Sequence, residues 1–217
     1  SMRWTGRPPT CGFRLDLVRE SGDRAKRGFD VVVGGAVLVV SLPVQAAVAV
    51  AIRRSMGSPV LFRQPRPGKD GVVFELVKFR TMRHPDARHV TDAERLTRLG
   101  RFLRSTSLDE LPTMWNVVKG DMSLVGPRPL LVEYLPLYTA VQARRHEVRP
   151  GVTGLAQISG RNALSWEDKF ALDVAYVDRR SLAVDLRILM RTLLSVVRHE
   201  NVNAPNHATI ERWRGQG

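Results

Sequence analysis

The feature that most constrains this chain is a hydrophobic segment, Phe29–Ile52, which carries a single charged residue, Asp30, near its start. About 20 apolar residues are enough to cross a bilayer as a helix, so the length predicts a membrane segment. Pro43 lies near the middle, two residues after Ser41, and a proline removes a helical hydrogen bond and kinks the axis. Each half is too short to cross alone, so we expect a helix kinked at Ser41 and Pro43.

The charges on both sides of this segment favour one topology over another. Cytoplasmic flanks of membrane helices are rich in Lys and Arg, and here both flanks are basic. A re-entrant helix that enters and leaves on the same face satisfies both flanks, whereas a spanning helix, which stays an alternative, satisfies one. We therefore divide the chain into a leader or amphipathic segment (residues 1–28), a re-entrant helix (29–53) and a domain that follows it (54–217). The basic residues are Arg24, Lys26 and Arg27 before the segment, and Arg53, Arg54, Arg63 and Arg66 after it.

The overall charge indicates an anionic partner. The 217 residues carry a formal net charge of +13, and a hydrophobic content of 43% excludes a disordered chain. Nucleic acid, lipid headgroups and phosphorylated small molecules all fit this charge. A single cysteine, Cys11, and scattered histidines leave no pattern typical of a zinc site, so a metal would be held by oxygen.

The pattern after the hydrophobic segment predicts a mostly helical α/β fold with short strands. Alternation over Val72–Arg80 indicates a strand, and Ser107 and Glu110 have the spacing of a capping box that would begin a helix ending at Gly120. A turn, a short strand and a loop are expected, in that order, within Thr153–Arg161. Further helices are expected over Asp92–Leu103, Val132–Val148, Trp166–Asp178 and Leu182–Arg198.

The last of these helices is amphipathic, and two interpretations of it stay open. Arg187, Arg191 and Arg198 share one face, while apolar residues cover much of the rest. Such a helix is either packed on the core with a solvated stripe, or lies at a membrane interface with its arginines at lipid phosphates.

Asp109 and Glu110 are the first candidates for chemistry. They stand at an expected helix start, where free N–H groups and the helix dipole keep an aspartate ionised and favour a nearby phosphate. Asp109 could act as a nucleophile on phosphorus, and Glu110 as an oxygen ligand to Mg²⁺. The alternative is that both are ordinary acids of a first helical turn.

Basic residues surround this pair in the sequence. Arginine binds phosphate through two N–H groups at once, and the prolines of Gly126-Pro-Arg-Pro129 would hold such an arginine still. The alternative for each is a solvated basic surface. The candidates are Lys78, Arg80, Arg104, Arg128 and Arg161.

Four motifs in this order resemble one family. They are Lys78-Phe-Arg-Thr-Met82, Ser107-Leu-Asp-Glu-Leu-Pro112, Gly120-Asp-Met-Ser-Leu-Val-Gly-Pro-Arg-Pro129 and Pro150-Gly-Val-Thr-Gly-Leu-Ala-Gln157. Behind a hydrophobic segment, they resemble the bacterial sugar transferases, the monotopic phosphoglycosyl transferases, in their minimal single-domain form. The stretch from Gly160 to Phe170 and the tail around Trp213 look most like the branch that feeds protein N-glycosylation, typified by the Campylobacter enzyme.

The resemblance implies a reaction and its substrates. Family members transfer a sugar 1-phosphate from a UDP-sugar to polyprenyl (undecaprenyl) phosphate, release UMP and use Mg²⁺. Asp109 matches the nucleophile that forms a phosphoglycosyl-aspartate, and Glu110 matches the Mg²⁺ ligand. Arg104 and Arg128 match phosphate-binding positions. Lys78, Arg80, Gln157 and Arg161 fall in motifs that line the same site.

The resemblance also implies a place in the cell. It predicts a monotopic protein of the inner (cytoplasmic) membrane, with its catalytic domain on the cytoplasmic face, in contact with anionic lipids and compatible with a homodimer. One departure is that Leu42 separates Ser41 from Pro43, which are adjacent in the family. A membrane-anchored nucleic-acid-binding protein and a non-catalytic scaffold are the competing functions. No recognition helix or aromatic-basic motif is visible, so we expect no nucleic-acid partner.

Overall fold

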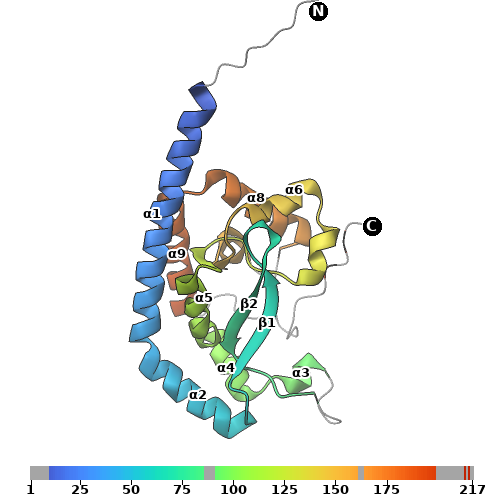
Figure 1. The fold of residues 1–217 in the computed structure, drawn as a ribbon. Coiled ribbons are helices and arrows are strands. Elements are labelled where there is room, and N and C mark those ends of the chain that lie inside the picture. The colour runs from blue at the N-terminus through green and yellow to red at the C-terminus, as the bar shows by residue number, and fades with distance from the viewer. Residues whose placement is uncertain (1–9, 86–90, 161–163, 199–212, 214, 216–217) are drawn as a thin grey trace, which may run out of the picture.

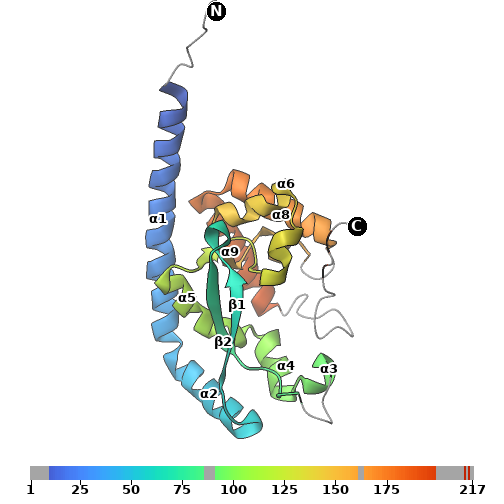
Figure 2. The ribbon, with the colours of Figure 1, turned by 45° about the vertical axis from the view of Figure 1, so that its right-hand side comes forward.

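The computed structural model describes residues 10–85, 91–160, 164–198, 213 and 215, with side chains from residue 22 onward except that of Val197. Arg161, one of the expected substrate-binding residues, lies outside this part of the chain. The long helix α1 (Thr10–Val40) runs along one side of the molecule, and α2 (Leu42–Met56) turns under one end of a β-hairpin (Figures 1 and 2).

The hydrophobic segment is bent where the sequence predicts it. The helices on either side of Ser41 are inclined by 57°, and within the described residues neither is long and apolar enough to cross a membrane alone. Pro43 lies in the first turn of α2, where its missing N–H has no helical partner to lose. The Gln45 side chain donates to Ser41 Oγ at 2.9 Å and so ties the two helices together at the break. The sequence analysis placed a segment boundary between residues 28 and 29; in the structure both residues lie inside the continuous helix α1.

The hairpin consists of β1 (Leu61–Pro67) and β2 (Val73–Phe79), paired antiparallel from Leu61 opposite Phe79 to Pro67 opposite Val73. A short 3-10 turn, η1 (Lys69–Gly71), joins the strands, and both Asp70 and Gly71 have positive φ there. The strand expected at Val72–Arg80 is confirmed to within one residue at each end. A second, parallel pair joins β3 (Ser123–Val125) to β4 (Gly151–Thr153).

Helices make up most of the rest, so the expected mostly helical fold with short strands is confirmed. The predictions over Trp166–Asp178 and Leu182–Arg198 correspond to α8 (Trp166–Arg179) and α9 (Leu182–Val197). The remaining elements are α3 (Asp92–Arg95), α4 (Arg98–Ser105), η2 (Leu108–Thr113), α5 (Met114–Lys119), η3 (Val132–Leu137), α6 (Ala140–Ala143), η4 (Arg144–Glu147) and α7 (Leu155–Ser159).

Several expected boundaries were wrong because local caps interrupt the hydrophobic periodicity. Asp92–Leu103 is two helices, since the Thr97 side chain accepts from the Gly100 N–H and starts a new one. Val132–Val148 is likewise three short pieces, with a capping box at Thr139. Within Thr153–Arg161 the strand ends at Thr153, and a helix, α7, follows in place of a loop.

Ser107 does not cap a helix, so the capping box expected there was wrong. Its φ of 56° places it in the left-handed region, and its side chain accepts no cap hydrogen bond. The chain then enters a 3-10 helix that contains Pro112, where the sequence pattern had predicted a regular helix start.

A buried polar network fastens α1 to the body of the molecule. Lys26 Nζ lies 2.6 Å from Asp185 Oδ2 of α9, and Asp30 Oδ1 accepts from the Leu124 N–H at 3.1 Å. Tyr176 Oη of α8 lies 2.7 Å from the other Asp185 oxygen. The two aspartates are 2% and 1% exposed, so these contacts fix the position of α1 against β3, α8 and α9.

Candidate active site

The carboxylate of Asp109 is positioned by the packing of η2 and α5 across strand β2. Thr113 Oγ1 donates to the Val77 carbonyl at 2.9 Å. The Asn116 side chain accepts from the Val77 N–H at 3.1 Å and donates to the Glu75 carbonyl at 2.7 Å. These bonds fix η2, which carries Asp109, beside Lys78 on β2. They therefore bring together the motif that begins at Lys78 and the motif that begins at Ser107.

Asp109 is 5% exposed, and its environment perturbs its acidity. Burial, followed by the negative charge of Glu110, raises the pKa of Asp109 to about 6, while Lys78, Arg104 and Arg128 act in the opposite direction. The carboxylate is therefore still largely ionised at pH 7. From the sequence, a helix N-terminus was expected to keep the Asp109 carboxylate ionised. In the structure η2 is a short 3-10 helix, and burial has the largest effect on the pKa of Asp109.

Glu110 and Arg128 form an ion pair at the same site. Arg128 Nη2 lies 3.0 Å from Glu110 Oε1, and the two side chains are 49% and 28% exposed. The Glu110 charge is also the largest influence that raises the pKa of Arg128. The two motifs that carry these residues thus meet, as the sequence predicts for a shared site.

Arg104 reaches the site from α4. Its Nε donates to Thr81 Oγ1 at 3.0 Å, just beyond the end of β2. Burial lowers the pKa of Arg104, and the Asp109 charge opposes this effect. Gly100 allows α4 to approach so closely, because a Cβ at that position would overlap the Thr81 carbonyl oxygen.

Lys78, the remaining cationic neighbour of Asp109, is partly desolvated. Burial lowers its pKa, and Asp109 and Glu110 raise it. Its Nζ lies 5.5 Å from the centre of the Phe62 ring on β1. The structure therefore places three of the expected basic residues, Lys78, Arg104 and Arg128, in the electrostatic environment of Asp109.

Two other expected site residues lie in different surroundings. Arg80 donates from Nη2 to the Met56 and Gly57 carbonyls, both at 2.7 Å, and from Nη1 to the Ser58 carbonyl at 3.3 Å. Its guanidinium therefore holds the connection between α2 and β1. Gln157 lies on α7, where its side-chain oxygen faces the backbone at Gly154.

Sequence reasoning missed a buried ion pair between Arg145 and Asp173, which holds the backbone carbonyl of Arg128. Arg145 Nη2 donates to the Arg128 carbonyl and lies 2.7 Å from Asp173 Oδ2, while Arg145 Nη1 donates to Tyr138 Oη at 3.1 Å. Arg145 is 3% exposed and Asp173 4% exposed. These residues come from η4 and α8, and no local pattern could have indicated that they meet.

Arg66 is a second residue that the sequence analysis had treated only as a basic flank. Burial, followed by the charge of Arg128, lowers the pKa of Arg66 to about 10. Its Nη2 donates to Gln64 Oε1 at 2.7 Å, and no carboxylate in the described part of the chain forms an ion pair with it. Arg66 thus adds positive charge on the Arg128 side of the site.

The carboxylates of Asp109 and Glu110 suit Mg²⁺ better than a metal that needs three or more protein ligands. Within the described ranges, no group of three or more His, Cys, Asp or Glu side chains is arranged to hold a metal. Mg²⁺ commonly binds one or two carboxylates and completes its coordination with water and substrate phosphate. Glu110 and the adjacent Asp109 fit this donor set, with one Glu110 oxygen already paired to Arg128.

Comparison with known proteins decides the family. The model of the bacterial sugar transferase family matches residues 21–199, which include all four motifs and the whole Asp109 site. The chain belongs to this family. It is therefore an enzyme, a transferase, and the resemblance seen in the motifs is confirmed.

Relatives agree over nearly the whole chain. The uncharacterized sugar transferase EpsL of Bacillus subtilis is 51% identical over 88% of this chain and 96% of its own length. A UDP-glucose:undecaprenyl-phosphate glucose-1-phosphate transferase of Caulobacter vibrioides is 39% identical over 85% of this chain and 74% of its length. The exopolysaccharide production protein ExoY of Rhizobium meliloti is 37% identical, over 82% and 88%. The N-glycosylation branch expected from the tail stays a prediction.

Proposed function

We propose that this sugar transferase moves a sugar 1-phosphate from a UDP-sugar to undecaprenyl phosphate and releases UMP. The observation that carries the proposal is the environment of Asp109: a buried, largely ionised carboxylate next to Glu110 and close to Lys78, Arg104 and Arg128. A nucleophile needs to be ionised and desolvated, and its phosphorylated substrates need cationic neighbours. The relative from Caulobacter carries this reaction in its name.

The reaction proceeds in two displacements. A carboxylate oxygen of Asp109 attacks the β-phosphorus of the UDP-sugar, the bond to the bridging oxygen breaks, and UMP leaves with that oxygen. A phosphate oxygen of the acceptor then attacks the same phosphorus, and the bond to Asp109 breaks. The products are a polyprenyl-diphosphate sugar and a regenerated carboxylate, so no other reactant is consumed.

The chain's own residues position and neutralise the phosphates. Lys78 and Arg104 lie close enough to Asp109 to affect its ionisation, and would stabilise charge on the transferring phosphoryl group. Arg128 can exchange its Glu110 partner for a phosphate. Mg²⁺, when bound at Glu110, would neutralise charge on the leaving phosphate.

Membrane attachment is part of the proposal, because one substrate is a lipid. Both arms of the bent helix pair expose apolar side chains, including Val32 (70%), Val40 (79%) and Leu42 (54%). We infer that this pair enters and leaves the bilayer from the cytoplasmic face, as the basic flanks of the segment favour.

Helix α9 adds a second apolar surface. Asp185 and Ile188 face the core, so the core-packed interpretation is correct for one side of the helix. The other side exposes Leu182, Leu186, Met190, Leu193 and Leu194, and Arg187 and Arg191 are exposed too. This is the arrangement of a helix at an interface with anionic lipid headgroups.

The test is UMP release in nanodiscs that contain undecaprenyl phosphate and Mg²⁺, across a panel of UDP-sugars. Asp109→Asn and Glu110→Gln are compared with the parent and with Asp70→Asn, an exposed acid in the hairpin turn. We expect release with at least one donor, lost in both site variants and kept in Asp70→Asn. Full release by Asp109→Asn would refute the covalent mechanism. Salt-sensitive DNA binding without any turnover would instead favour the nucleic-acid-binding function.

A further inference from the structure

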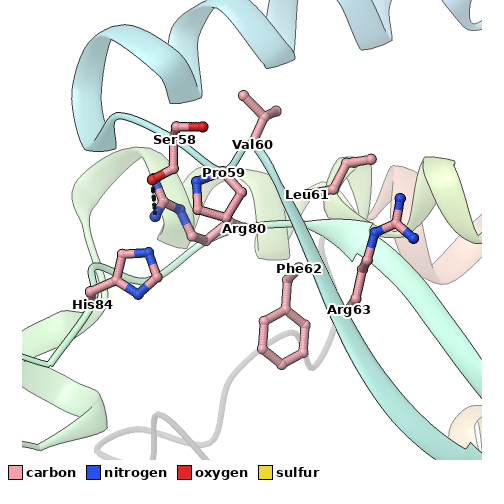
Figure 3. Close-up of a pocket in the computed structure, with 8 residues that line it drawn as sticks. All are labelled: Ser58, Pro59, Val60, Leu61, Phe62, Arg63, Arg80 and His84. Carbon is pink, nitrogen blue, oxygen red and sulfur yellow. Dashed lines mark hydrogen bonds between the residues drawn. The ribbon is translucent and has the colours of Figure 1, made fainter.

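A cavity of about 560 Å³ lies beside the connection between α2 and β1, within the usual size range of small-molecule sites (Figure 3). Its wall is mostly apolar and is formed by Pro59, Val60, Leu61 and Phe62, with Ser58 at the end nearest α2. Arg80 lies beside Pro59 with its guanidinium bound to the Ser58 carbonyl, and Arg63 and His84 provide further polar groups (Figure 3). None of these residues has a role in the two displacements described above.

The cavity wall contacts one of the cationic groups that surround Asp109, and a second is bound one residue along the chain from the wall. The ring of Phe62 lies under Lys78 Nζ, whose charge affects Asp109. Arg80 directly precedes Thr81, whose hydroxyl accepts the hydrogen bond from Arg104. A molecule in this cavity would therefore have one end beside Phe62, whose ring contacts Lys78, one of the cationic groups near Asp109.

The other end of the cavity meets the proposed membrane segment. Ser58 follows α2 by two residues, and Arg80 binds the last carbonyls of that helix. Val60 and Leu61 pack with Val48 and Ile52 of α2 in one hydrophobic cluster. The apolar wall is thus continuous with the helix that we place in the bilayer.

We propose that this cavity holds the first isoprene units of the polyprenyl phosphate acceptor and guides its phosphate past Phe62 to Asp109. This inference rests on the proposed function, which requires an amphiphilic acceptor to bring its phosphate to Asp109 while its tail stays in lipid. The apolar lining suits the hydrocarbon, and the positive charge of Lys78, which lies over the Phe62 ring, suits a phosphate that passes this residue. A UDP-sugar would gain little from such a wall, since its diphosphate, ribose and sugar are polar.

The direct test is photolabelling in nanodiscs with undecaprenyl phosphate that carries a diazirine in its first isoprene units. Mass spectrometry should map the label to residues 58–63, and unlabelled undecaprenyl phosphate should displace it, whereas excess phosphatidylglycerol should not. Ser58→Trp fills the cavity from an exposed position. Val72→Trp makes the same bulky addition at the far end of the hairpin and is the matched control.

We expect Ser58→Trp to reduce labelling and to raise the KM for undecaprenyl phosphate about fivefold, or about 1 kcal/mol of binding. The KM for the UDP-sugar should change much less, and Val72→Trp should behave like the parent. Equal labelling of the parent and Ser58→Trp, or displacement by phosphatidylglycerol, would overturn the assignment. A parent that takes up label but releases no UMP would refute the transferase mechanism and still support the lipid site.

Discussion

The ion pair between Arg145 and Asp173 makes the sharpest prediction about what holds the site together. Asp173→Asn keeps the size of the side chain and removes its charge, which leaves the buried guanidinium of Arg145 without a counter-ion. Breaking a buried pair in this way costs about 3–5 kcal/mol. For a chain of this size, each kcal/mol shifts the melting temperature by about 2–4 °C, so we expect a decrease of about 10 °C.

The same substitution should weaken catalysis by a separate route. Arg145 also donates to the Arg128 carbonyl, and this contact fixes the Gly-Pro-Arg-Pro loop. A displaced Arg145 would let Arg128 move relative to Glu110, so the KM for the UDP-sugar should rise even at temperatures where the variant is folded. The measurements are thermal unfolding in detergent and UMP release at 20 °C.

A neighbouring pair provides the control. Arg144 and Asp178 are as close, at 2.6 Å, and also join η4 to α8, but they are exposed. Asp178→Asn should change the melting temperature little, because exposed ion pairs contribute little to stability.

A double variant separates the stability effect from the positioning effect. Burial raises the pKa of Asp173 in spite of Arg145, so desolvation outweighs the attraction between them. Arg145→Met with Asp173→Leu should therefore recover most of the stability but not the KM. A melting temperature of Asp173→Asn as high as that of Asp178→Asn would refute this account of the pair.

Three further outcomes follow from particular contacts. Gly100→Ala should lower both stability and the rate of UMP release, since a Cβ there overlaps the Thr81 carbonyl; circular dichroism and turnover measure the two effects. Asp30→Ala leaves the buried Leu124 N–H without its acceptor and should cost about 1–3 kcal/mol in thermal unfolding. Burial lowers the pKa of His146 to about 4, so the neutral form favours folding, and stability should fall as the pH drops from 6.5 towards 4. His146→Gln should flatten that pH dependence by about 1 kcal/mol, allowing for solvent screening.

The sequence predicted the parts of the site that are local and missed those that depend on long-range packing. Asp109, Glu110 and Arg128 stand in motifs that resemble those of the family, and the structure brings those motifs together. Asp173 is 28 residues from Arg145 and has no sequence signal that marks it as buried. Arg80 stands in a basic motif, but its guanidinium is bound by the backbone carbonyls of Met56 and Gly57 at the end of α2, a long-range contact that the motif does not indicate.

The fold shows the same division between local and tertiary effects. The break at Ser41 was predictable because proline acts locally, and so were α8 and α9, which have long periodic patterns. The capping box at Ser107 was wrong because this residue is left-handed and makes no cap hydrogen bond, and the contacts of η2 with β2 are tertiary contacts that the local sequence does not contain.

The covalent intermediate is the central claim, and peptide mass spectrometry tests it most directly. The parent is incubated with its UDP-sugar and Mg²⁺ in the absence of acceptor, digested, and searched for a peptide heavier by one sugar phosphate. We predict a single adduct on Asp109, formed with one equivalent of UMP, discharged by undecaprenyl phosphate and missing in Asp109→Asn. Turnover that proceeds with no adduct, or with an adduct on another residue, would contradict the account.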